Sequence, residues 1–198
     1  MASSPTRQTF GLSLDSIPAS DEYLTLNFSP SSAARRRRWG NYGLSADFLG
    51  DYFAAFFPGD EVPDSKINRR NTVKAAVSYI ANELIENAVK YSDAGSPLPI
   101  SITLHLYEQE IIFEVTNHTT ADRAASYQNF IQILLAANLE EFYIQQLEKT
   151  AMGDGVSNMG LLTIMNDYAA NMGWQFQPLS DRPEVVKVTV MACLHIAD

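Results

Sequence analysis

Residues 82–92 constrain the fold more than any other part of the chain. They space Glu83, Asn87 and Lys90 four and three residues apart. On an α-helix these spacings place the three polar groups along one face. An apolar stripe lies roughly 100° around the same helix; it consists of Ile80, Leu84, Ala88 and Tyr91. The pattern predicts a helix that packs its apolar stripe on a sheet and offers a carboxylate, an amide and an ammonium side by side.

These three groups suit a particular chemistry. A carboxylate with an amide oxygen suits a hard cation such as Mg²⁺, and an ammonium suits a phosphate. The spacing also fits an amphipathic helix whose polar face meets only water, and the helix pattern by itself leaves both interpretations open.

The segment resembles the N-box of the GHKL, or histidine-kinase-like, ATPases. It satisfies both patterns of that box, E-x-x-x-N from Glu83 to Asn87 and N-A-x-K-Y from Asn87 to Tyr91. The resemblance implies ATP and Mg²⁺ as cofactors, with Asn87 as the metal ligand, Lys90 touching phosphate and Tyr91 near the nucleoside. It also implies that Glu83 is the general base, as in the anti-sigma-factor serine kinases.

The second box of the family departs from its pattern in this chain. In the family a strand ends in an aspartate that accepts from the adenine amino group, and a glycine-rich turn follows. Asn117 stands at the aspartate position, and a Thr119-Thr120 pair replaces the glycines. The amide oxygen of Asn117 can still accept a hydrogen bond, more weakly than a carboxylate. Without glycine, close approach of the backbone to a nucleotide is sterically disfavoured.

The third box is a glycine-rich loop that opens a helix, where backbone N–H groups meet phosphates. Gly153 and Gly155 form such a loop, and Gly160 matches a glycine of the family's helix start. One glycine of that start is lost. Ser157 and Asn158 are candidates to cap the helix or donate to phosphate.

Residues 120–150 lie between the second and third boxes and read as helical, with a break near residues 137–138. In sensor kinases this segment is a flexible lid. A structured segment here predicts a partner-docking element or a less mobile lid.

The order of expected elements predicts an α+β fold. It is a two-layer sandwich with helices on one face of a mixed, mainly antiparallel sheet, and the resemblance implies the same GHKL, or Bergerat-like, architecture. The expected elements are a helix over 71–91, strands over 100–106 and 111–116, the helical segment, a helix over 161–170, a strand from 174 and a last strand over 185–194.

The chain divides into three segments by pattern. Residues 1–20 are rich in Ser, Thr and Pro and are expected to be mobile. Residues 21–69 form an N-terminal extension, with a strand over 23–28 and a helix over 46–57 capped by Ser45. Glycines 40 and 43 interrupt an earlier helical stretch over 32–39. Residues 70–198 form the ATPase-like domain. The aromatic face of the 46–57 helix is a candidate dimer face.

The net charge is −9, which argues against a nucleic-acid or anionic-membrane surface. An arginine run over 35–38 is the exception; it favours a solvated helix face, with an acidic partner as an alternative. The sole cysteine, Cys193, cannot form an internal disulfide. The three histidines lack metal-ligand spacing. With no signal peptide or membrane span in the pattern, we expect a cytoplasmic protein.

The sequence is compatible with two functions. The first is an ATP-dependent serine/threonine protein kinase of the anti-sigma or SiaB type, acting on a small regulatory protein of the STAS or SiaC kind. The Glu83 base position favours it. The second is a catalytically silent binding module that sequesters a regulatory partner, which the lost glycines and Asn117 favour.

Overall fold

The computed structural model describes residues 7–13, 17, 19–20, 22–28, 32–59, 68–93, 96–151 and 159–196, and only the backbone within 32–41 and 150–151. The helices are α1 (Ser32–Ala54), α2 (Arg69–Tyr91), α3 (Ala121–Ala136), α4 (Leu139–Ala151) and α5 (Met159–Asn166). The strands are β1 (Gln8–Gly11), β2 (Glu22–Phe28), β3 (Ile100–Leu106), β4 (Glu110–Thr120), β5 (Asn171–Pro178) and β6 (Val185–His195).

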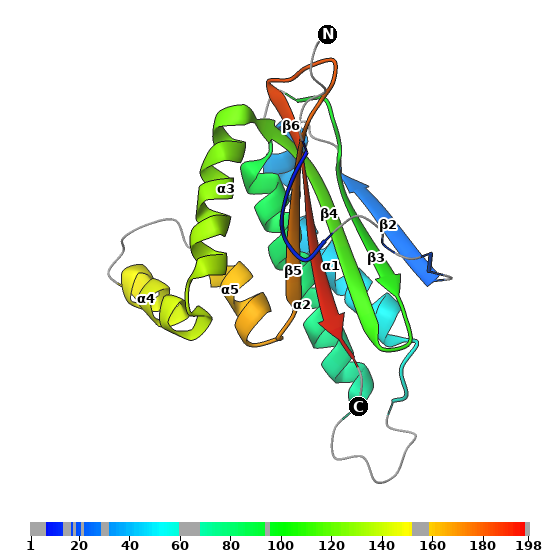
Figure 1. Cartoon of the computed structure of the whole chain (residues 1–198). Coiled ribbons are helices and arrows are strands. Elements are labelled where there is room, and N and C mark those ends of the chain that lie inside the picture. Colours follow the sequence, from blue (N-terminus) through cyan, green and yellow to red (C-terminus); the bar gives the residue numbers. More distant parts are fainter. Residues whose placement is uncertain are drawn as a thin grey trace.

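The strands form one six-stranded sheet in the order β1-β5-β6-β4-β3-β2. Every neighbouring pair is antiparallel. Helices α1 and α2 stack behind the sheet, and α3, α4 and α5 gather beside β5 (Figure 1). The predicted α+β two-layer fold is confirmed, with a sheet that is antiparallel throughout. β4 and β6 occupy its middle. β6 is buried without a break from Val188 to Leu194, whereas β4 is buried over residues 111–113 and alternates beyond.

Helix α2 forms where its sequence pattern predicts. Asn68 caps the start, and its side chain accepts from the Asn71 N–H at 3.0 Å. Ser92 ends the helix in extended backbone, and both its N–H and its hydroxyl donate to the Ala88 carbonyl. Ile80, Leu84 and Ala88 of the apolar stripe are buried, and the helix packs on β3 and β4. Tyr91 at the end of the stripe is only half-buried. The neighbouring polar stripe therefore lies over the middle of the sheet, where Asn87 lines a pocket with residues of β4 and β6.

Helix α1 differs from its prediction. The sequence predicts a break at glycines 40 and 43 and a new helix capped by Ser45, but α1 is continuous and ends at Ala54. A glycine inside a helix destabilises it by about 1 kcal/mol, which packing of α1 along α2 offsets. Gly50 permits that packing, because an added Cβ there would lie 2.9 Å from the Lys74 carbonyl oxygen. The arginines at 35–38 lie in α1, outside the residues whose side chains are described.

Two short elements near the sheet edge also differ. The segment expected to be mobile contains β1, whose residues pair with β5. The helix expected over 161–170 ends at Asn166, and Ala169 adopts a positive φ of 49° just before β5 begins. Gly173 lies inside β5 rather than stopping a helix. A Cβ on Gly173 would lie 2.3 Å from the Leu12 carbonyl oxygen, so close passage of the N-terminal segment requires glycine here.

β2 belongs to the same sheet as the strands beyond residue 70, because it pairs with β3 along its whole length. Phe48 and Phe56 of the aromatic segment are each 50% exposed, whereas Phe53 is fully buried. The predicted aromatic face is therefore partly core and partly surface. None of the helices in the described ranges is long and apolar enough to cross a membrane.

Candidate functional site

The site begins with an alternation along β4. Val115, Asn117 and Thr119 are successive residues on the core face of this strand. Asn117 is 4% exposed and Thr119 is 3% exposed, so an amide and a hydroxyl continue a stripe that is otherwise apolar. The strand runs on to Thr120, beyond the predicted end at residue 116, and α3 begins at once. β-branched threonines favour this extension, in place of a glycine-rich turn.

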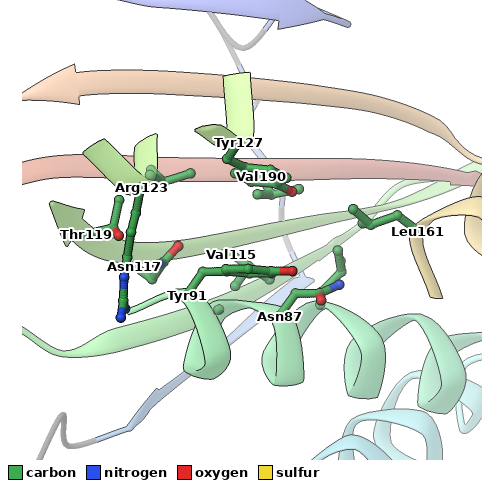
Figure 2. Close-up of a pocket in the computed structure, with 12 residues that line it drawn as sticks. Asn87, Tyr91, Val115, Asn117, Thr119, Arg123, Tyr127, Leu161 and Val190 are labelled. Carbon is green, nitrogen blue, oxygen red and sulfur yellow. The ribbon is translucent and has the colours of Figure 1, made fainter. Parts of the chain in front are cut away.

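A pocket lies between this stripe and two helices. Asn87 and Tyr91 project from α2, whereas Arg123 and Tyr127 come from α3 (Figure 2). Asn117, Thr119 and Arg123 lie toward one end and Leu161 of α5 toward the other. The remaining lining residues are apolar: Leu84, Ala88, Val115, Val188 and Val190. The pocket therefore combines a few polar groups with apolar walls, the usual composition of a small-molecule site.

The hydroxyl of Thr119 is a polar atom without a partner. Within the part of the chain that the structure describes, its Oγ1 is buried and makes no hydrogen bond. Leaving such a group unsatisfied is unfavourable by about 1–3 kcal/mol. An orphaned hydroxyl in a pocket that also holds Asn117 is the feature expected where a polar ligand completes the bonding.

Two tyrosines close the pocket. The rings of Tyr91 and Tyr127 stack with centroids 5.7 Å apart and an interplanar angle of 14°. The Tyr127 hydroxyl accepts from the indole N–H of the fully buried Trp174 at 3.0 Å. Burial raises the pKa of Tyr127, and the Trp174 N–H opposes that rise. With the rings in contact, the space left in the pocket is about 20 Å³, room for about one water molecule.

A wider groove adjoins the closed pocket and shares Tyr91, Arg123 and Tyr127 with it. Its volume is about 520 Å³, and Lys90, Asp122, Ser126 and Phe130 complete its lining. The Lys90 ammonium lies 5.2 Å from the centre of the Tyr91 ring. Arg123 donates to the Ser92 carbonyl at 3.3 Å. The groove thus holds two cations, an arrangement that suits phosphate oxygens.

Glu83 lies one turn before Asn87 and packs against the start of α5. A Cβ on Gly160 would lie only 1.8 Å from Oε2 of Glu83, so the carboxylate occupies the space of a missing side chain. Burial raises the pKa of Glu83, with a further rise from the neighbouring Glu86 carboxylate. A raised pKa makes a carboxylate a stronger proton acceptor, which is the direction a general base needs.

The structure thus brings together some of the site residues that the sequence predicts. Asn87, Tyr91 and Asn117 line one pocket, Lys90 lies in the adjoining groove, and Glu83 meets Gly160 beside them. Gly153, Gly155, Ser157 and Asn158 lie outside the described residues.

Sequence reasoning missed Thr119, Arg123 and Tyr127. Thr119 lies two residues beyond Asn117 and therefore on the same face of the strand, so the spacing in the sequence could have indicated it. The other two are four apart on α3, whose start at residue 121 makes them face the pocket.

No protein-family model matches the chain, and no curated protein matches its sequence. In three dimensions it is similar to a chain in the crystal structure of the SiaB-SiaC complex from Pseudomonas aeruginosa. The TM-score is 0.58 at 16% sequence identity, over 86% of this chain and 89% of the other. The similarity establishes a shared fold.

The side chains of the site fit a nucleotide in their chemistry. Asn117 and Thr119 offer hydrogen-bonding groups for a base edge, two tyrosine rings offer stacking surfaces, and Lys90 and Arg123 offer positive charge. The closed pocket is too small for a purine. A purine would fit only if Tyr91 and Tyr127 moved apart, or in the groove beside them.

Proposed function

We propose that this protein is an ATP-dependent serine/threonine protein kinase that phosphorylates a small regulatory protein in partner-switching signalling. One observation carries the proposal: the α2 stripe of Glu83, Asn87 and Lys90 runs beside a pocket that holds Asn117 and the orphaned Thr119 hydroxyl. The fold shared with a chain of the SiaB-SiaC complex supports it, as does the N-box resemblance.

Each residue of the stripe has a role under this proposal. Mg-ATP supplies the transferable phosphoryl group and the charge that balances it. Asn87 binds the metal through its amide oxygen, and Lys90 with Arg123 neutralises phosphate charge. Glu83 accepts the proton of the substrate hydroxyl, helped by its raised pKa. Asn117 and Thr119 hydrogen-bond the base.

The first test separates binding from transfer. Purified protein is incubated with γ-labelled Mg-ATP and an extract of the source organism, and labelled protein is detected after electrophoresis. Glu83→Ala should retain Mg-ATP binding and lose the labelled band, because it removes only the base. Asn87→Ala should lose both. Glu114→Ala is the matched control, since this half-buried carboxylate of β4 faces the other side of the sheet. A Glu83→Ala protein that labels the same band at the wild-type rate contradicts the base assignment.

A second function has its own support. The pocket has room for about one water while Tyr91 and Tyr127 stack, and no glycine follows Asn117. These features favour a silent module that has kept the fold and binds a regulatory partner without nucleotide. Absence of Mg-ATP binding at millimolar concentration, together with intact partner binding by the Asn87→Ala variant, would select this function over the kinase.

A further inference from the structure

Three metal-binding side chains meet at the ends of the two central strands. Glu110 is the first residue of β4, and its register partner on β6 is His195. Cys193 lies two residues before His195 and therefore on the same face of the sheet. The ligand atoms of these three side chains all lie within 4.8 Å of one another. The sequence separates Glu110 from the other two by more than 80 positions, so only the strand register reveals the cluster.

The contacts within the cluster show how its side chains are oriented. The Cys193 thiol donates to Oε2 of Glu110 at 2.9 Å. Nε2 of His195 lies 3.4 Å from Nδ2 of Asn171, on the neighbouring strand β5. Sulfur, carboxylate oxygen and imidazole nitrogen thus converge from two strands, with a side-chain amide beside them.

The cluster is buried on the side of Cys193 and open to solvent on the side of His195. Cys193 is 5% exposed and packs with Ile112 and Met191, against which Ile17 and Tyr107 also lie. Glu110 is half-buried and His195 is exposed. An apolar surround strengthens electrostatic attraction to a cation, and the exposed imidazole leaves a route from solvent.

We propose that Glu110, Cys193 and His195 bind a zinc ion. Thiolate, imidazole and carboxylate are the ligand types of zinc, and three protein ligands with one open position form a recognised zinc arrangement. The thiolate disfavours Mg²⁺ and Ca²⁺, which take oxygen ligands. Binding replaces the thiol proton, which passes to solvent, and a water is available for the fourth position. The ion would tie the start of β4 to the end of β6.

The zinc site is independent of the proposed kinase function. Cys193 points to the face of the sheet opposite Ala192 and Leu194, which belong to the main core on the helix side. Asn117 and Thr119 lie on that helix side. A negative result for the zinc site therefore does not affect the kinase proposal, and a negative result for the kinase does not affect the zinc proposal.

The test uses cobalt as a spectroscopic substitute for zinc. Full-length, tag-free protein is reduced, stripped of metal and titrated with Co²⁺. Because Cys193 is the sole cysteine in the chain, a thiolate-to-cobalt charge-transfer band reports this residue alone. We expect one cobalt per chain, displacement of the band by one equivalent of Zn²⁺, and no band in Cys193→Ser.

Three further variants keep the proposal testable if Cys193→Ser folds poorly. His195→Ala changes an exposed side chain and Glu110→Gln is isosteric; each should weaken Zn²⁺ binding by at least about 10-fold. His118→Ala is the matched control, because His118 lies on the same face of β4, eight residues or about 27 Å along the strand. It should bind Zn²⁺ as the wild type does.

Several outcomes would overturn the proposal. A missing charge-transfer band at saturating Co²⁺ removes the thiolate ligand. One metal per two chains assigns the ion to a contact between copies. Unchanged zinc affinity in both His195→Ala and Glu110→Gln means that the cluster is a thiol–carboxylate hydrogen bond and nothing more.

Discussion

Replacing Gly160 by alanine tests whether Glu83 packs on the start of α5. The new Cβ would lie 1.8 Å from Oε2 and 3.0 Å from Cγ of Glu83. To reach even the shortest tolerated contact of 3.0 Å, the carboxylate has to retreat by at least 1.2 Å, the difference between 3.0 and 1.8 Å. The head of a glutamate can do this by leaving its preferred rotamer, which destabilises by about 0.5–1.5 kcal/mol. The helix backbones need not move.

The same substitution has an opposite, local effect. Alanine favours helix over glycine by up to about 1 kcal/mol. In the wild type the two effects nearly cancel, so Gly160→Ala should change the free energy of unfolding by less than about 1 kcal/mol. In a Glu83→Ala background the collision is gone, and Gly160→Ala should stabilise by about 0.5–1 kcal/mol. The two sites should therefore couple by about 1 kcal/mol.

Urea unfolding of the four proteins measures this coupling as a double-mutant cycle. Independent sites add to within about 0.3–0.5 kcal/mol. Additive free energies would refute the reasoning, because they would mean that the Glu83 head does not fill the space at Gly160. The displaced carboxylate also has a functional consequence: a misplacement of about 1 Å lowers catalysis by about 100-fold. Under the kinase proposal, Gly160→Ala should lose phosphotransfer to that extent and still bind Mg-ATP.

Three further predictions follow from buried contacts. Tyr127→Phe leaves the indole N–H of Trp174 unpaired and should destabilise by about 1–3 kcal/mol in urea unfolding; an unchanged midpoint would mean that the bond is absent. Gly50→Ala collides with the α2 backbone and should destabilise by about 1–3 kcal/mol, whereas Gly43→Ala, with open space around it, should not; equal effects would contradict the close packing of α1 on α2. For Glu83→Gln, the sign follows from a pKa that is higher in the folded protein than in the unfolded chain. As pH rises from about 4, ionisation of Glu83 favours the unfolded state of the wild type. The glutamine variant should therefore gain stability relative to the wild type until the pH reaches the folded pKa, and the difference should stay constant above it. A difference in the free energy of unfolding that does not change with pH would contradict the raised pKa.

Periodicity predicted the elements whose pattern is long and uninterrupted. Helix α2 and strands β3 and β6 lie close to their predicted positions, because α2 and β3 bury a regular stripe and β6 is buried almost throughout. The predictions for α1 and β1 were wrong because tertiary packing outweighs local sequence preference there. Helix α1 runs through its glycines because it packs along α2, and β1 forms because β5 offers an open edge.

The candidate site divides in the same way. The α2 stripe could be predicted because its spacing is a pattern within one helix, and Asn117 because it stands at the aspartate position of the second box in the family resemblance. Arg123 and Tyr127 could not, because their position depends on β4 continuing to Thr120 before the chain turns into α3. The stacking of Tyr127 on Tyr91 likewise depends on how α2 and α3, which β3 and β4 separate in sequence, pack beside each other on the sheet.

Titration calorimetry of Mg-ATP into the wild-type protein and the Asn87→Ala variant tests whether the α2 face and its pocket bind a nucleotide. We expect saturable binding of one nucleotide per chain that depends on Mg²⁺ and weakens by at least about 10-fold in the variant, a loss of about 1.4 kcal/mol. Equal binding by both proteins, or no binding to the wild type at millimolar Mg-ATP, would contradict the assignment of the α2 face and its pocket to a nucleotide.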